Sequence, residues 1–177
     1  GKSLVAQGLM ENFPWQENVA SYAWNTYVEE EVEKFHIIRL FLQRLSDCGR
    51  NLLVIDNLLP CDKEVVPLVQ QLIREILGES LPKYHLIVVY IFNVNSLDTL
   101  EVYERNLNSI QEIPHIKTIN FRGFGEKELR DCIRREARME NLQLTIEKVN
   151  DIVETLDVSK SGCKNVHAKV LTHGQRV

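Results

Sequence analysis

The alternation of apolar and polar positions along the chain predicts helices and strands that follow one another in turn. The unbroken run Leu52-Leu53-Val54-Ile55, which ends in Asp56, is typical of a strand buried on both faces of a parallel sheet. The strongest strand signal covers His85 to Phe92. In chain order we expect helix 2–12, strand 19–28, a helix from 29, strand 52–55, helix 65–77, strand 85–92, an irregular stretch 97–113 and strand 116–121.

This order predicts an α/β fold in which helices flank both faces of a parallel sheet. The pattern changes after Arg122, where strand signals end and charged amphipathic helices begin. We therefore expect an α/β body over residues 1–122 and a small helical subdomain, or lid, over residues 123–177. Lid helices are expected at 125–141, 145–156 and 162–171, and the helix from 29 is expected to bury Val32, Phe35, Ile38, Leu42 and Leu45.

Composition narrows the class of protein. The chain has 177 residues, of which 44% are hydrophobic and 26% charged, so it is too apolar to be disordered and long enough for a body with a lid. A net charge of −4 argues against nucleic acid as a partner, since phosphate binding needs a basic surface. The four cysteines show no metal-site spacing, but they leave one or two disulfides open.

The chain opens with Gly1-Lys2-Ser3 directly before a helix, which matches the end of the phosphate-binding loop G-x-x-x-x-G-K-[ST]. In such a loop the glycine lets backbone N–H groups close on phosphates, the lysine reaches the β- and γ-phosphates, and the serine hydroxyl binds Mg²⁺. Three residues are a weak signal, because a surface loop or a tag remnant fits them equally well. If the motif is real, the true N-terminus lies upstream of Gly1.

Polar residues follow the two strongest strands. Asp56, after the buried run, is where a Walker B aspartate would hold Mg²⁺ through water. Asn93, after the next strand, would sense the γ-phosphate or orient water, with Asn95 as the competing candidate and an ordinary turn as the other interpretation. Asn57 follows Asp56, where hydrolytic ATPases of the AAA+ class carry a glutamate base, and a carboxamide accepts no proton at neutral pH. We expect nucleotide binding with severely slowed hydrolysis, because Asp62 and Glu64, the substitute bases, lie beyond Pro60.

Two segments of the lid carry a family resemblance. The stretch Glu128 to Arg134, which contains Cys132-Ile133-Arg134, and the later stretch Ser161 to Val166, which contains Gly162-Cys163-Lys164, resemble torsins, the AAA+ ATPases of the endoplasmic reticulum lumen. A cysteine just before the Walker B strand, in Asp47-Cys48-Gly49-Arg50, is a further match. The resemblance covers nearly the whole chain.

The resemblance implies roles for individual residues. Gly1, Lys2 and Ser3 would bind ATP in the Walker A loop, although many torsins have asparagine where Ser3 stands, and Asp56 would be Walker B. Asn57 and Asn93 would occupy the catalytic positions, with Asn93 as sensor I and Lys164 as the sensor II cation. Cys132 and Cys163 would form a redox-responsive disulfide, helped by Lys164, which favours the Cys163 thiolate. The sequence departs from the family at Asn57 and at Cys61.

The function implied is Mg²⁺-dependent, ATP-driven protein remodelling at the endoplasmic reticulum and nuclear envelope. Torsins act as homo- or hetero-oligomeric rings on protein clients, and they need a membrane-anchored luminal activator that supplies an arginine finger. Three alternatives stay open: a non-hydrolysing ATP-binding scaffold of the same family, a cytosolic STAND-type signalling NTPase, and a plain α/β binding module with chance motifs.

Overall fold

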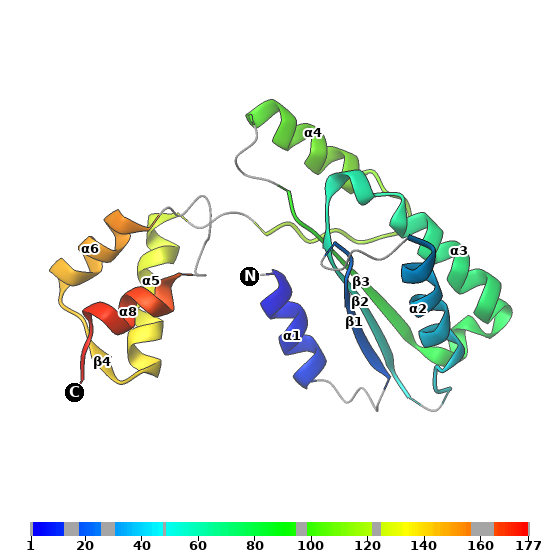
Figure 1. Ribbon diagram of the computed structural model, residues 1–177, viewed down its shortest axis with the longest axis horizontal. Coiled ribbons are helices and arrows are strands. Elements are labelled where there is room, and N and C mark those ends of the chain that lie inside the picture. The colour runs from blue at the N-terminus through cyan, green and yellow to red at the C-terminus, as the bar shows by residue number, and fades with distance from the viewer. Residues whose placement is uncertain are drawn as a thin grey trace. The chain divides into compact units, whose positions relative to one another are not determined.

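The computed structural model describes residues 2–12, 18–25, 31–47, 49–94, 99–121, 125–156 and 165–176. These residues form two compact units, Lys2–Thr118 and Ile119–Val177. The boundary expected after residue 122 falls a few residues beyond this division. Each unit is described below by itself (Figure 1).

The first unit is built on a three-stranded parallel sheet of order β1-β2-β3. Strand β2 lies in the middle, with Val54 opposite Ser21 on one side and Val89 on the other. Because parallel neighbours require crossover connections, helices cover the sheet, and the α/β expectation is confirmed at this level. The elements are α1 (Lys2–Asn12), β1 (Val19–Ala23), α2 (Glu31–Gln43), β2 (Asn51–Leu58), η1 (Pro60–Asp62), α3 (Val65–Leu77), η2 (Gly78–Tyr84), β3 (Leu86–Phe92) and α4 (Leu100–Gln111).

Strand β2 separates two clusters of buried apolar side chains, as the unbroken apolar run predicts. Leu52 and Val54 pack with Ala6 of α1 on one face. Leu53 and Ile55 pack on the other face with side chains of α2 and α3. All four β2 residues are at most 1% exposed, so helices cover both faces of the sheet.

Four expectations for residues 2–121 differ from the structure. The stretch expected to be irregular contains helix α4, which Thr99 caps by accepting a hydrogen bond at Oγ1 from the Val102 N–H at 3.3 Å. The strand expected at 116–121 is absent from the described residues, and Ile119 is 75% exposed, because no neighbouring strand offers it a ladder. Val32 is 76% exposed rather than buried. Strand β1 ends at Ala23, and residues 26–30 lie outside the described residues.

The second unit consists of α5 (Glu126–Met139), α6 (Ile146–Thr155) and α8 (Val166–His173), with an antiparallel pair of two-residue strands, β4 (Leu142–Gln143) and β5 (Gln175–Arg176). The three helices agree with the expected lid helices, except that the last one is described only from Val166. Their shared core contains Leu129, Ile133, Ala137, Val149, Ile152, Leu156, Val166 and Val170. None of the helices in the described ranges is long and apolar enough to cross a bilayer.

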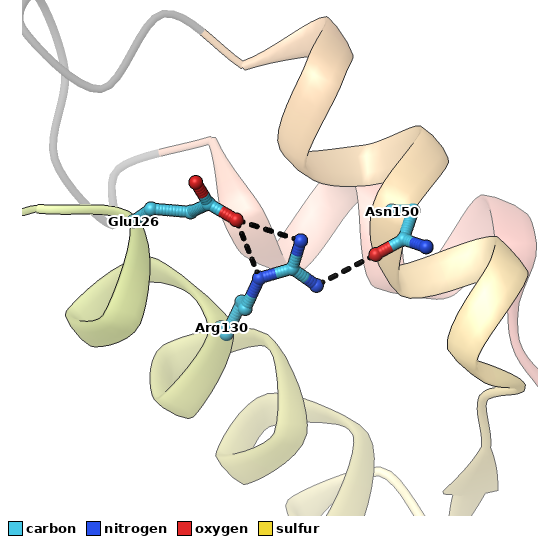
Figure 2. A network of polar contacts seen from close by, with 3 residues as sticks. All are labelled: Glu126, Arg130 and Asn150. Atoms are coloured by element: carbon cyan, nitrogen blue, oxygen red, sulfur yellow. Dashed lines mark hydrogen bonds and ion pairs between the residues drawn. The ribbon is translucent and has the colours of Figure 1, made fainter.

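Arg130 ties two helices of this unit together (Figure 2). Its Nε and Nη2 atoms donate to Glu126 Oε1 at 2.8 and 2.7 Å, and its Nη1 donates to Asn150 Oδ1 of α6 at 2.7 Å. The guanidinium is partly buried, and its rigid fork holds both acceptors at once. Arg130 therefore links α5 to α6 in addition to their shared apolar core.

Truncation of the body core should destabilise the protein in proportion to burial. Leu72 and Leu68 lie one turn apart on α3 and are 7% and 43% exposed. We expect Leu72→Ala to lower the free energy of unfolding by about 2–4 kcal/mol, because it leaves a cavity. The matched control Leu68→Ala should cost less than about 1 kcal/mol. Urea unfolding followed by circular dichroism measures both, and equal losses would contradict the assignment of the core.

Candidate functional site

Helix α1 begins on the side of the sheet where the strands of the first unit end. Figure 1 shows α1 running antiparallel to the strands, so its N-terminal end lies on the side where the strands end. Lys2, which is partly exposed, and Ser3, which is exposed, form that end of the helix. Because a helix N-terminus carries unpaired N–H groups and partial positive charge, this edge is suited to an anion.

Asp56 closes the buried part of β2 at the same edge. Its backbone carbonyl accepts a hydrogen bond from the Trp24 N–H at 2.9 Å, which aligns the ends of β1 and β2. Its Oδ1 accepts from the Asn57 N–H at 2.6 Å. Within the described residues no protein group bonds the second carboxylate oxygen, so Asp56 keeps one oxygen for a ligand.

Asn57, the next residue of β2, has a left-handed φ of 60° at an irregularity in the β2–β3 register. Asparagine tolerates this conformation better than most residues do. Its Oδ1 accepts a hydrogen bond from Asn93 Nδ2 at 3.0 Å, and the Asn93 N–H donates to the Leu58 carbonyl at 2.7 Å. The structure therefore brings Asn57 and Asn93 together as a pair of hydrogen-bonded carboxamides.

Asn25 and Asp62 hold Asn57 and the loop after β2 in place. The sequence pattern had singled out Asp62 but not Asn25. Asn25 Nδ2 donates to the Asn57 carbonyl at 2.7 Å and to Asp62 Oδ2 at 2.8 Å. The same Asp62 oxygen accepts from the Leu59 N–H at 2.8 Å. Asp62 is thus occupied by loop hydrogen bonds, which makes it a poor substitute base. The only signal for Asn25 was its place after β1, where a polar turn residue is common.

Several expected site residues cannot be compared with this geometry. Gly1, Asn95, Cys163 and Lys164 lie outside the described residues. Their roles, and the approach of the lid to the sheet, therefore stay predictions.

The described cysteines differ in state. Cys132 of α5 is disulfide-bonded and packs against the core of the second unit, whereas Cys61 is free and exposed. Cys48 and Cys163 lie outside the described residues, so the partner expected for Cys132 stays a prediction.

A magnesium ion held with a nucleotide fits the donors at this edge. Among the described residues no three His, Cys, Asp or Glu side chains gather closely enough to hold a metal by themselves. Magnesium at phosphate sites, however, needs only one or two protein oxygens besides phosphates and water. The free oxygen of Asp56 and the exposed hydroxyl of Ser3 are ligands of this kind.

Comparison with protein-family models, with curated proteins and with solved structures finds no match for this chain. The fold and the site therefore define its class: an α/β protein with a parallel sheet flanked by helices and polar side chains at the carboxyl edge of its central strands.

Burial of Tyr90 on β3 makes stability sensitive to alkaline pH. Its Oη is buried without a hydrogen-bond partner among the described residues, and this desolvation raises the pKa of Tyr90 well above its usual value of 10. Above about pH 10 the unfolded chain loses the tyrosine proton first. The free energy of unfolding is therefore unaffected by Tyr90 ionisation below about pH 10. It falls as pH rises from there towards the pKa of Tyr90 in the folded state.

We expect Tyr90→Phe to leave stability at pH 7 unchanged or to raise it by up to about 1 kcal/mol, because an unpaired hydroxyl is removed. The loss of stability between about pH 10 and 12 should become shallower than in the parent. Urea unfolding across this pH range measures both effects, with Tyr103→Phe on α4 as the control for loss of a tyrosine. An unchanged pH profile in Tyr90→Phe would contradict the assignment.

Proposed function

We propose that this chain binds Mg²⁺–ATP at the carboxyl edge of its sheet as a torsin-like P-loop protein of the AAA+ class. Gly1 and Lys2 bind the phosphates, Ser3 and Asp56 hold the magnesium ion, and Asn93 contacts the γ-phosphate or its attacking water. Bound Mg²⁺ would neutralise charge on the β- and γ-phosphates.

The observation that carries the proposal is that three elements of the first unit, α1, β2 and β3, have the relevant ends on the same side of the sheet. The N-terminal end of α1, the last residues of β2 and the residue after β3 supply a cation, a carboxylate and a carboxamide. The Asn57–Asn93 hydrogen bond joins β2 to the end of β3. Ligands of open parallel sheets bind outside the carboxyl ends of the strands. Lys2 adds a charge that pairs with phosphate.

Hydrolysis is slow in this proposal because the site lacks a base. The Oδ1 atom of Asn57 accepts a hydrogen bond from Asn93, and a carboxamide takes no proton from water at neutral pH. Asp62 is held by Asn25 and the Leu59 N–H. The same hydrogen bonds favour a second candidate function, a non-hydrolysing ATP-binding scaffold or regulator of the same family.

The cellular role in the proposal follows the resemblance to torsins. The protein works in the endoplasmic reticulum lumen and nuclear envelope, in an oligomeric ring that remodels protein clients with a membrane-anchored activator. Lys164 acts as the sensor II cation, and a Cys132–Cys163 bridge makes the lid respond to redox conditions. The disulfide-bonded state of Cys132 supports an oxidising compartment over the cytosol of a STAND-type NTPase.

Removal of the phosphate cation or of the magnesium carboxylate should weaken nucleotide binding. We expect Lys2→Ala and Asp56→Asn each to raise the Kd for Mg²⁺–ATP at least about tenfold, since each removes a charge-assisted contact. Titration calorimetry measures the Kd. Lys83→Ala on η2, which precedes β3 at the opposite end of the strands, removes an exposed lysine away from the site and should change nothing. A parent chain that shows no Mg²⁺–ATP binding would instead favour the plain α/β module.

Restoring a carboxylate after Asp56 should restore hydrolysis. We expect Asn57→Glu to raise the single-turnover rate of ATP hydrolysis about 100-fold, within the range that a positioned general base supplies. Asn57→Gln has the same length without the base, and it controls for the strain of a longer side chain at a φ of 60°. If the parent hydrolyses ATP as fast as Asn57→Glu, the argument from the missing base fails, and both the slow-hydrolysis proposal and the scaffold candidate fail with it.

A further inference from the structure

A groove of about 330 Å³ runs between the outer edge of β1 and helix α2. It is lined on the strand side by Ser21, Tyr22, Ala23 and Trp24, on the helix side by Lys34, Ile37 and Ile38, and at one end by Asp56. Of these residues, Asp56 belongs to the site described above, and Trp24 contacts that site through its backbone N–H. The rest of the lining is a mixture of apolar, aromatic and backbone surface that the proposed nucleotide site does not use.

The backbone of β1 offers unpaired hydrogen-bonding groups to this groove. The Asn18 carbonyl accepts from the Leu52 N–H, and the Trp24 N–H donates to the Asp56 carbonyl, so the even-numbered residues of β1 face β2. Since the direction alternates along a strand, Val19, Ser21 and Ala23 turn their N–H and C=O groups outward. In the part of the chain that the structure describes, β1 is an edge strand and no group pairs with this edge.

The edge also lacks the features that usually prevent pairing with another strand. Strand β1 reads Val-Ala-Ser-Tyr-Ala, with no charged residue and no proline. The N–H and C=O groups along a strand edge have the spacing of those in another extended polypeptide, which can pair with them. The groove beside the edge provides space for the side chains of such a polypeptide.

Lys34 gives the groove a preference for negative charge. It is partly buried, with Nζ 4.9 Å from the centre of the Trp24 ring, and no carboxylate among the described residues pairs with it. Trp24 in turn packs edge-on against Phe35 at a centroid distance of 5.3 Å, which fixes the ring. An ammonium held on an aromatic face without an anion is a ready partner for an incoming carboxylate.

We propose that this groove binds an extended polypeptide segment, which adds to the edge of β1 as a further strand and places an acidic side chain at Lys34. Main-chain hydrogen bonds to the outward-facing residues of β1 supply affinity. Lys34 and the apolar side chains of Ile37 and Ile38 that line the groove supply selectivity. A second copy of this chain is the less fitting occupant, because β1 itself carries no acidic residue to place at Lys34.

The test uses a capped, fluorescein-labelled peptide of about nine alternating valine and threonine residues with one central glutamate. Fluorescence anisotropy without nucleotide should give saturable binding to the chain. Replacement of the glutamate by glutamine should weaken binding about fivefold or more, and N-methylation of alternate peptide bonds should abolish it, because the strand pairing is lost. The glutamine peptide with an uncapped C-terminus tests a terminal carboxylate, which should not restore affinity.

Two protein variants complete the test. Lys34→Gln should weaken binding of the glutamate peptide about fivefold and should not affect the glutamine peptide, whereas the control Lys83→Gln leaves both unchanged. Ser21→Pro removes an outward N–H without removing a bond to β2 and should weaken binding about tenfold. If this variant does not fold, the N-methylated peptide tests the same main-chain hydrogen bonds from the side of the ligand.

Three results would overturn the proposal. They are absence of binding at millimolar peptide, equal affinity of Lys34→Gln and the parent, and a dimer in sedimentation that Ser21→Pro dissociates while no peptide binds. The last result would assign the edge to a second copy. Lys2→Ala should bind the peptide normally, so failure of ATP binding and failure of peptide binding are distinguishable.

Discussion

Strand β2 is buried on both faces, because α1 covers one face and α2 and α3 cover the other. This burial determines where polar side chains can appear along the strand. A strand enclosed in this way has no place for an unpaired polar side chain until it leaves the core. Asp56 is the first such residue after the buried run, and it appears where the Trp24 N–H bonds its carbonyl. The polar edge of the sheet is thus a consequence of the burial of β2.

The turn beyond Asp56 is shaped by amides rather than by charges. Asn57 adopts a left-handed conformation that few side chains tolerate, and its carbonyl and carboxamide are both held, by Asn25 and by Asn93. Asp62 accepts from Asn25 and from the loop backbone, so the turns after β1, β2 and β3 are joined by one network. Such a network orders a binding surface well, but its amides accept no proton at neutral pH and its carboxylate, Asp62, already accepts hydrogen bonds from Asn25 and the Leu59 N–H.

The sequence predicted those helices and strands whose burial leaves a regular pattern of apolar residues within the element itself. The run from Leu52 to Ile55 was recognised because burial on both faces leaves no polar position, and α3 because its apolar positions recur at helical spacing. Helix α4 was missed because only Ile110 among its residues is fully buried, so its pattern is mostly polar.

The site was predictable only in part, for a related reason. Asp56 and Asn93 stand at strand ends, and position alone marks them. The Asn57–Asn93 pair and the bonds of Asn25 join residues more than thirty positions apart, which no local pattern encodes. The strand expected at 116–121 failed likewise, because strand formation depends on a neighbour and not on local propensity.

Asp56 lies in both the proposed nucleotide site and the groove along β1, and its charge links them electrostatically. Its Oδ1 is held by the Asn57 N–H, so its negative charge remains at the end of the groove when no cation is bound. That charge repels an acidic peptide, while Lys34 attracts it from the side of α2. In the proposed site magnesium would bind together with ATP, and because the Mg²⁺–ATP complex keeps a net negative charge, nucleotide binding would not remove this repulsion. The two sites are therefore expected to disfavour each other's ligands, and linkage requires that this coupling be the same in both directions.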